Sequence, residues 1–381
     1  MKYLNQITLL IFIISVVLPT NISAQKKNER AYKFKTVIEI PTTPVKDQQS
    51  TGTCWSYATT SFLETELIRM GKDEYDLSEM FFVRNAFKIK AMNYVRRHGE
   101  ANFSQGGQAH DVLDVIKKVG IVPEEVYKGK KYNLPEHDHG EMEAVIKGIL
   151  DAVLKQNSDK LTDVWPKTVD AVLDIYMGEF PVQFTHKNNT FGPKSFEEQL
   201  GLDISDYIEL TSYSHHPYYK KINLEIPDNW SSDLYYNLPV EELMQVFDYA
   251  FKNGYSVCWD GDVSSKCFSH SEGIAIVPVD PELDDDEIFS VIRKEKEITQ
   301  ELRQKTFNDF TTTDDHLMHL VGIVQDQEGT KYYVTKNSWN ENSNEYGGLL
   351  NMSENYVKLN TVAILVHKDA VPQAIREKLD L

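Results

Sequence analysis

The N-terminal part of the chain carries apolar residues at the spacing of amphipathic helices. Within residues 54–70, apolar side chains recur every three or four positions, and Gly71 follows as an expected C-terminal cap. The same pattern predicts helices over residues 78–97, 109–119 and 142–154. We therefore expect this part of the protein to be mainly helical.

The later part of the chain shows short runs of β-branched and aromatic residues separated by polar turns, which is typical of strands. The predicted strands cover residues 205–213, 255–259, 273–279, 319–324, 331–336 and 362–367. Helices followed by strands predict an α+β protein with two lobes. Ligand sites commonly lie where such lobes meet.

The N-terminus has the pattern of a cleavable export signal. Lys2 precedes an apolar run at residues 7–18, and the small residue Ala24 precedes a polar segment. A membrane anchor is the alternative, but the run is shorter than the ~20 residues that a spanning helix needs. We expect residues 1–24 to be removed and the protein to be exported without a stable membrane anchor, to the periplasm or to the extracellular medium.

The net charge limits which partners the protein can bind, and the number of cysteines limits how many disulfides it can form. The 381 residues have a net charge of −18, which disfavours nucleic acid as a partner because phosphate binding needs a surplus of basic residues. The three cysteines allow at most one disulfide and leave at least one thiol. Cys258 and Cys267 flank a turn and either pair with each other or both stay reduced; spacing does not decide between these alternatives.

Cys54 is the first residue of a predicted helix and follows a turn that contains Gly52. The positive end of the helix dipole favours the thiolate over the thiol there. A buried structural cysteine is the alternative interpretation. A nucleophilic cysteine also needs a base and a group that orients the base, usually distant in sequence.

A second stretch offers both groups. His316 stands at the start of an expected strand, and Asn337 ends the next strand, where its amide is placed to hold the imidazole. Trp339 is placed to cover that hydrogen bond. His319 competes for the role of base, but three residues along a strand it points to the face opposite His316.

Together these motifs resemble the papain-like cysteine peptidases. The order of the motifs carries the resemblance: Gln48, then Cys54-Trp55, then Asp315-His316 on a strand that reaches Val321-Gly322, then Lys336-Asn337-Ser338-Trp339. Within that family, the chain is similar to the bleomycin hydrolase or aminopeptidase C branch. Further matches to that branch lie at residues 106–108, 119–123, 190–196, 201–207, 260–263 and 367–372.

The resemblance implies a role for each matching residue. Cys54 would be the nucleophile, His316 the general base and later acid, and Asn337 the group that holds the imidazole tautomer. Gln48 and the backbone N–H of Cys54 would form the oxyanion hole. Residues that would line the substrate-binding cleft are Gly106, Gly107 and Trp339.

The resemblance also implies a papain-like two-lobed fold with a large insertion. The helical lobe would cover about residues 45–160, the inserted region about 140–250, and an antiparallel, β-barrel-like lobe about 250–370. The implied activity is peptide hydrolysis, by an aminopeptidase in preference to an endopeptidase, with no metal or organic cofactor. Some members form hexamers that bind DNA; the acidic charge argues against DNA here and leaves the hexamer open.

Two features depart from the branch. Asn340 follows Trp339 where the family usually has glycine, so the next loop is expected to differ in shape. The sequence ends at Leu381, before the longer C-terminal arm of the branch, which puts strict aminopeptidase action in doubt. Two alternatives therefore stay open: a non-catalytic peptide-binding scaffold, and a hydrolase of non-peptide amides with the same triad.

The neighbouring residues His215 and His216 raise the question of a metal site. No third ligand stands at a suitable spacing in the sequence, so a polar loop is the preferred interpretation and no metal is predicted.

Overall fold

The computed structural model describes residues 31–131, 135–156, 160–280 and 283–381. The predicted signal peptide lies outside these residues, and the predicted boundaries of the lobes stay predictions. No helix within the described ranges is long and apolar enough to cross a membrane.

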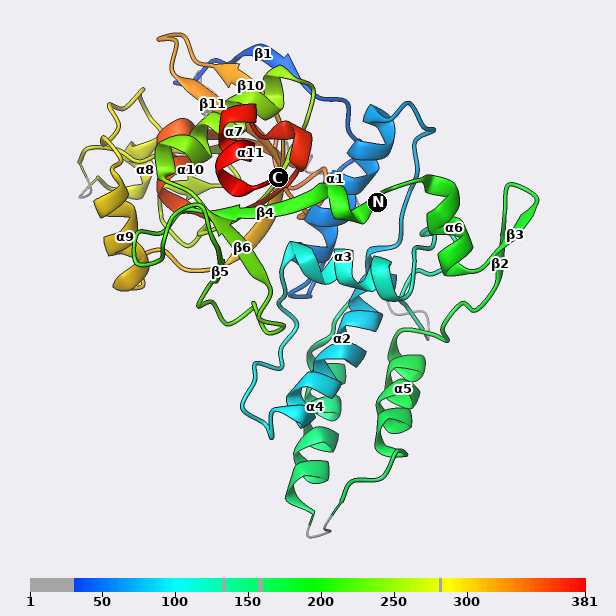
Figure 1. Cartoon of the computed structure of the whole chain (residues 1–381). Helices are drawn as coiled ribbons and strands as arrows, with labels where there is room; N and C mark the ends of the chain where they lie inside the picture. Colours follow the sequence, from blue (N-terminus) through cyan, green and yellow to red (C-terminus); the bar gives the residue numbers. More distant parts are fainter. Residues whose placement is uncertain (1–30, 132–134, 157–159, 281–282) are drawn as a thin grey trace, which may run out of the picture.

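The N-terminal helices form at the predicted places. Ser78 accepts a hydrogen bond from the Phe81 backbone N–H at 3.1 Å and begins the second helix, and Gly120, at φ 107°, follows the third. Two further helices were not predicted. The six helices are α1 (Cys54–Arg69), α2 (Glu79–Arg96), α3 (Ala109–Lys118), α4 (Gly140–Lys155), α5 (Trp165–Tyr176) and α6 (Pro193–Leu200) (Figure 1).

One large sheet forms the strand-rich lobe. Its strands are β1 (Lys35–Glu39), β4 (Tyr207–Thr211), β5 (Lys221–Asn223), β6 (Leu234–Asn237), β7 (Val257–Gly261), β8 (Phe268–Ser269), β9 (Ile274–Ala275), β10 (His316–Gln325), β11 (Lys331–Lys336), β12 (Leu349–Ser353) and β13 (Thr361–His367). The order is β5-β6-β4-β13-β7-β10-β11-β12-β9-β8, and β1 pairs with β10. The pairing is antiparallel except for β4 with β6 and β12 with β9. A separate hairpin joins β2 (Phe184–His186) to β3 (Asn189–Phe191).

The strand-rich part also contains helices that were not predicted from the sequence. They are α7 (Val240–Lys252), α8 (Asp285–Ile288), α9 (Gln300–Asn308), α10 (Glu354–Asn360) and α11 (Gln373–Leu379). Helix α11 buries Ile375 and Leu379 in the same apolar cluster as α7 and the sheet. The α+β class with a helical and a strand-rich lobe is confirmed.

Helix α1 occupies the centre of the molecule. Fourteen of its sixteen residues are buried, because β10 and β7 cover one side and α2 and α3 the other. The Phe62 ring is completely buried and lies edge-on to Tyr207, with 5.6 Å between the ring centroids. This packing fixes the first turn of α1 close to the start of β10.

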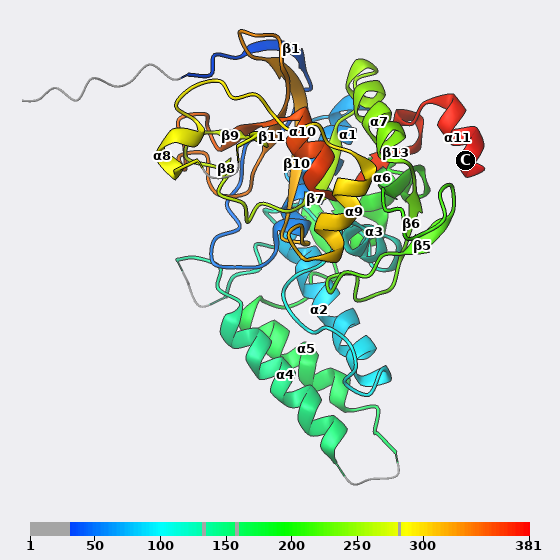
Figure 2. The same cartoon turned by 90° about the vertical axis from the view of Figure 1, so that its left-hand side faces the viewer.

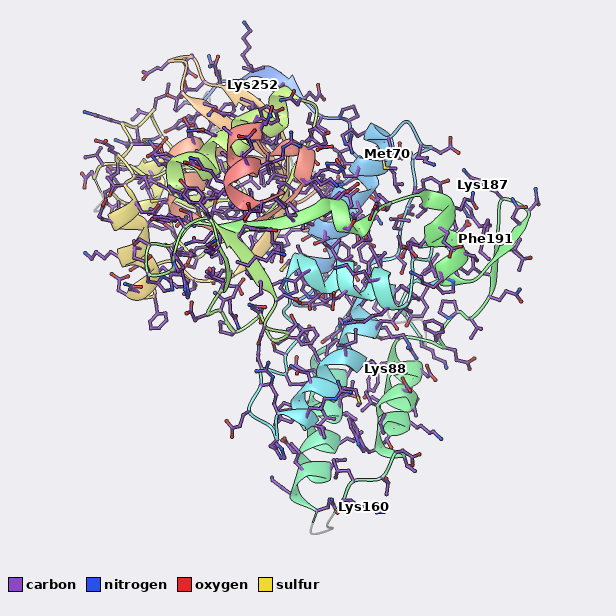
Figure 3. The ribbon with its side chains drawn as sticks, viewed as in Figure 1. Met70, Lys88, Lys160, Lys187, Phe191 and Lys252 are labelled. Atoms are coloured by element: carbon purple, nitrogen blue, oxygen red, sulfur yellow. The ribbon has the colours of Figure 1, made fainter. Side chains whose placement is uncertain are left out.

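Helices α4 and α5 project from the body as a long antiparallel pair (Figure 2). Helix α5 is attached along α2, where the ammonium of Lys88 (labelled in Figure 3) contacts Asp170 at 2.9 Å and the Arg84 guanidinium contacts Asp174 at 2.5 Å. The projecting pair therefore joins the molecule on the side of α2 and leaves the α1–β10 contact to other elements.

We expect Phe62→Ala to lower the free energy of unfolding by about 3–5 kcal/mol, because it opens a cavity between α1 and the sheet. The exposed ring of Phe310, 82% accessible, is the control, and Phe310→Ala should change stability by less than about 0.5 kcal/mol. Urea unfolding followed by circular dichroism measures both. Equal losses in the two variants would contradict the central role of α1.

Candidate active site

Cys54 begins α1 and is 8% exposed. Thr53, the residue before it, makes no side-chain capping bond to the helix, so the first N–H groups stay uncapped. Burial raises the pKa of the Cys54 thiol to about 12, and a hydrogen bond from the Leu317 backbone opposes that rise. Burial therefore acts against the effect expected of the helix dipole on this thiol.

His316 and Asn337 meet as predicted from their strands. His316 begins β10, Asn337 follows β11, and the imidazole Nε2 lies 2.8 Å from the amide Oδ1 of Asn337. The Ser338 backbone N–H donates to the same Oδ1 at 2.7 Å, which identifies this atom as the oxygen. The proton of the imidazole is thus on Nε2, and Nδ1 carries the lone pair that a general base needs.

The surroundings of His316 keep its imidazole neutral. Burial lowers its pKa to about 4, and the hydrogen bond to Asn337 only partly offsets this effect. The Trp339 ring covers the imidazole with 4.9 Å between the ring centroids. Trp339 therefore lies where it shields the His316–Asn337 hydrogen bond from water.

Gln48 is held beside these residues by its side-chain amide. The amide Oε1 accepts a hydrogen bond from the Ser338 hydroxyl at 2.6 Å, and Nε2 donates to the Thr51 carbonyl at 2.6 Å. Among the described residues this uses one N–H of the amide, so the second is available to a ligand. This N–H and the uncapped N–H of Cys54 are the donors that the expected oxyanion hole would use.

Gly106 and Gly107 lie next to the first turn of α1. A side chain at Gly107 would meet the Trp55 ring at 3.0 Å and the Asp111 carboxylate at 2.7 Å. A Cβ at Gly106 would overlap the carboxylate of Asp228. A side chain at either glycine would therefore displace a neighbour. The sequence did not indicate that Asp228 is one of these neighbours.

His319 is placed apart from this group. Its Nδ1 lies 2.8 Å from the Ser61 hydroxyl, in the buried contact between α1 and the sheet. Asn337 pairs with His316, not with His319.

His270 and Ser338 are residues of the site to which sequence reasoning gave no role. The Asn337 amide Nδ2 lies 3.2 Å from Nδ1 of His270, whose Nε2 lies 2.7 Å from the Ser343 hydroxyl. Ser338 holds Asn337 through its backbone N–H and Gln48 through its hydroxyl. Ser338 belongs to the Lys336-Asn337-Ser338-Trp339 motif. His270 lies in a polar turn far from Asn337 in the sequence, and no sequence motif pointed to it.

Asn340 adopts φ 75°, the left-handed region in which glycine is favoured. Asparagine is among the residues that tolerate this conformation best. Asn340 therefore adopts the backbone conformation that a glycine would adopt at this position. The expected change in loop shape does not arise from the backbone of this residue.

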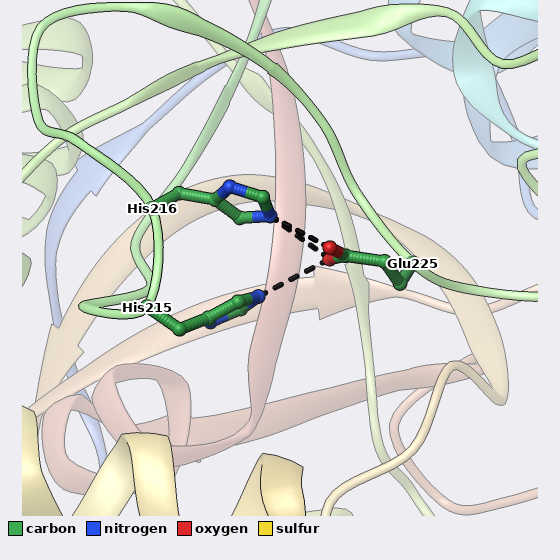
Figure 4. A group of neighbouring side chains, drawn as sticks. All are labelled: His215, His216 and Glu225. Carbon is green, nitrogen blue, oxygen red and sulfur yellow. Dashed lines mark hydrogen bonds and ion pairs between the residues drawn. The ribbon is translucent and has the colours of Figure 1, made fainter.

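His215, His216 and Glu225 form a second polar cluster (Figure 4). The two Nε2 atoms lie 3.1 and 2.9 Å from the carboxylate, so the fold supplies the third donor that sequence spacing did not reveal. Gln304 accepts from the Ser214 backbone at 2.6 Å and turns its Nε2 to Nδ1 of His215 at 2.9 Å. The His215 proton is thus on Nε2, toward Glu225, and a cation there would have to displace it; the prediction of no metal stays a prediction.

Two other features bear on the search for the site. The cysteines form no disulfide with one another within the described ranges, and Cys258 instead lies 3.7 Å from the Thr59 hydroxyl. A cavity of about 1000 Å³ lies between α2, α5 and the segment around Trp230, and its lining residues include no cysteine. Chemistry rather than volume therefore places the candidate active site at Cys54.

The fold, with a cysteine beginning the central helix beside a paired histidine and asparagine, is that of the papain-like cysteine peptidases. The chain belongs to the Peptidase C1-like family, whose model matches residues 13–381. The predicted resemblance to the bleomycin hydrolase and aminopeptidase C branch is confirmed.

The relatives extend over most of the chain. Aminopeptidase G and aminopeptidase W of Lactobacillus delbrueckii subsp. lactis are each 24% identical over 90% of this chain and cover 84% and 85% of their own lengths. Cysteine proteinase 1, mitochondrial, of Saccharomyces cerevisiae (strain JAY291) is 22% identical over 93% of this chain and 80% of its own. The crystal structure of PepW from Lactobacillus rhamnosis HN001 superposes with a TM-score of 0.70 at 18% identity, covering 91% of this chain and 84% of that one.

We expect the His316 imidazole to titrate near pH 4. Its pKa in the unfolded chain is about 6.5, so the unfolded state takes up this proton first, and the associated stability is lost as the pH falls from about 6.5 to about 4. Proton NMR of the ring in a Cys54→Ala variant, where no thiol competes for the proton, measures the pKa. A midpoint at or above 6.5 would contradict the neutral, buried imidazole.

Proposed function

We propose that this protein is an exported cysteine aminopeptidase that hydrolyses peptide bonds through a thioester on Cys54. One observation carries the proposal: the hydrogen bond from His316 Nε2 to Asn337 Oδ1, 2.8 Å long, leaves the basic Nδ1 at the start of β10, beside α1. The names of the relatives, which are aminopeptidases and a cysteine proteinase, support it.

Acylation follows from this geometry. As the Cys54 sulfur adds to the scissile carbonyl carbon, its proton passes to Nδ1 of His316, and the carbonyl oxygen becomes an oxyanion. The Cys54 N–H and the Gln48 amide donate hydrogen bonds to that oxygen. His316 then gives the proton to the leaving amine, the C–N bond breaks, and the acyl group remains on sulfur.

Deacylation reverses the proton transfers. A water molecule gives a proton to His316 as its oxygen adds to the thioester carbonyl, and the same two donors hold the second oxyanion. The C–S bond breaks, the sulfur regains the proton from His316, and the carboxylic acid leaves. Asn337 keeps the same imidazole tautomer through both halves because its Oδ1 is fixed by Ser338.

The two alternative functions differ from the proposal in what they require. A non-catalytic scaffold had its support in Asn340, and the left-handed backbone of Asn340 removes that support. A hydrolase of non-peptide amides would use the same groups and differs only in substrate. A panel of peptide and non-peptide amides, each with a free and a blocked N-terminus, separates these functions.

We also propose that the protein is exported through residues 1–24 and acts in the periplasm or outside the cell on peptides, without nucleic acid as a partner. The pattern around Lys2 and Ala24 and the net charge of −18 support this proposal. N-terminal sequencing of the secreted protein tests the cleavage after Ala24.

Cys54→Ala should abolish peptide hydrolysis, with a loss of about 10⁵-fold or more, and should abolish labelling by an epoxide or iodoacetamide probe. Cys267→Ala is the matched control, since it removes a thiol outside the site, and should keep both properties. Hydrolysis and labelling that persist in the Cys54 variant would overturn the proposal.

Gln48→Ala should lower kcat by about 10²–10³-fold, because one donor to the oxyanion is lost. The rate of Cys54 alkylation by iodoacetamide should change little in this variant, since alkylation of sulfur forms no oxyanion. Steady-state kinetics and timed mass spectrometry measure the two rates. A parallel loss of alkylation would show that Gln48 acts on the thiol and not on the oxyanion.

A further inference from the structure

A second histidine, His270, lies next to the His316–Asn337 pair, and the mechanism above gives it no role. It lies in the turn between β8 and β9. Its Nδ1 lies 3.2 Å from the amide Nδ2 of Asn337, the end of that amide that His316 does not use. Its ring also contacts Trp339 edge-on, with 5.0 Å between the ring centroids. His270 therefore contacts both residues that surround the His316 imidazole.

The hydrogen bonds around His270 fix which of its nitrogens carries the proton. The Ser343 hydroxyl donates to the Asn340 carbonyl, so its oxygen accepts from Nε2 of His270, 2.7 Å away. Nε2 is therefore protonated, and Nδ1 carries a lone pair. The Asn337 amide presents its nitrogen to that lone pair, because the Ser338 N–H already identifies its oxygen. Asn337 thus donates the hydrogen bond and neutral His270 accepts it.

These bonds form one chain in which each residue donates to the next. His316 donates to Asn337, and Asn337 donates to His270. His270 in turn donates to Ser343, and Ser343 donates to the Asn340 carbonyl. Hydrogen bonds in series polarise one another, so donation by the Asn337 amide makes its oxygen a better acceptor. In the proposed acylation step that oxygen binds the imidazolium of His316, and the chain therefore supports the charged form of the base.

The loop of residues 340–348 holds the turn that carries His270. Asn344 donates through its side-chain Nδ2 to the His270 carbonyl at 2.8 Å. A Cβ at Gly273, the last residue of the turn, would overlap the Tyr346 ring, so the turn and the loop are in close contact. The loop whose first residue departs from the branch is thus the loop that fixes His270.

Protonation of His270 would break this arrangement. With a proton on Nδ1, His270 and Asn337 would present donors to each other. The Asn337 amide cannot turn over to avoid this, because the Ser338 N–H holds its oxygen. Positive charge on His270 also opposes a second charge on His316, whose pKa it lowers. The chain of hydrogen bonds therefore exists only while His270 is neutral.

The surroundings of His270 favour its neutral form. Burial lowers its pKa, and the groups that face it are uncharged or exposed. They are the neutral His316 of β10, Asn337 and Trp339 after β11, Ser343 and Asn344 of the following loop, and the exposed Glu272 of its own turn.

We propose that His270 is a positioning residue for the reaction at Cys54. While neutral, it holds the Asn337 amide, and through it the His316 imidazole, in the orientation and the tautomer that acylation requires. Protonation of His270 as the pH falls removes this support and stops the reaction. This inference rests on the proposed function and describes a regulation of the same site.

Two variants separate the hydrogen bond of His270 from its ring. His270→Phe keeps an aromatic ring against Trp339 but removes the acceptor, and should lower kcat by about 3- to 10-fold with little change in KM. His270→Asn offers an amide oxygen near the position of Nδ1 and should keep kcat within about 2-fold at neutral pH. His98→Asn, at an exposed histidine, is the matched control and should change neither constant. An unchanged kcat in His270→Phe would overturn the role.

Ser343→Ala tests the same chain with His270 in place. This variant removes the acceptor of the Nε2–H, so the ring is no longer held in one tautomer. It should lower kcat in the same direction as His270→Phe. Circular dichroism confirms that each variant is folded, so that a loss of rate is not a loss of structure.

The pH dependence of kcat/KM tests the titration of His270. In the parent both His270 and His316 must be neutral, so the rate falls as soon as the first of them takes up a proton. In His270→Asn only His316 remains, which titrates at about 4, and the acid limb should extend to lower pH. An acid limb that is the same in both proteins would overturn the control by pH.

Alkylation of Cys54 separates this inference from the proposed function, because it needs His316 to take the thiol proton but needs no peptide. The rate with iodoacetamide should fall by about 3- to 10-fold in His270→Phe, in step with kcat, unlike the rate in Gln48→Ala. Nitrogen NMR of a Cys54→Ala variant should show His270 and His316 both protonated at Nε2.

The outcomes are distinct. An unchanged alkylation rate in His270→Phe, or a neutral His270 ring protonated at Nδ1, would overturn the positioning role. A slower alkylation in His270→Phe and the expected tautomers, in a parent protein that hydrolyses no peptide, would support the positioning role and overturn only the proposed function.

Discussion

The contact between α1 and β10 is the constraint on which the rest of the structure depends. It is polar at its centre: the Lys336 ammonium donates to the Thr43 carbonyl at 2.7 Å and to the Ser61 hydroxyl at 2.8 Å, and Ser61 in turn contacts His319. Buried polar groups of this kind are satisfied in only one relative position of helix and strand. That position sets the start of α1 beside the start of β10, and with it Cys54 beside His316.

Burial of this contact also sets the charge state of the site. The thiol of Cys54 and the imidazole of His316 are both desolvated, so each favours its neutral form before substrate arrives. In the proposed mechanism, the proton therefore moves from Cys54 to His316 as the sulfur bonds to the substrate. The same packing thus buries the Cys54 thiol and the His316 imidazole and places the N–H donors of Cys54 and Gln48.

The sequence predicted those features that depend on local signals or on motif order. Helix α1 and strand β11 lie where their apolar patterns place them, and Cys54, His316 and Asn337 are found in the expected elements. Helix α7 was missed because the strand signals on both sides dominated the interpretation of that region. His270 was not found because it acquires its role from Asn337, which is 67 residues away in the sequence and lies near it only in the folded chain.

The attachment of α4 and α5 has a consequence for how such chains diverge. Helix α5 is tied to α2 by Lys88–Asp170 and Arg84–Asp174, helix α4 by Tyr94–Asp151, and the two helices project away from the sheet. Whole helical turns, each about 5.4 Å, can therefore be inserted into or deleted from this pair without moving Cys54. The hairpin is a place where lineages can vary in length and surface while the chemistry stays under separate selection.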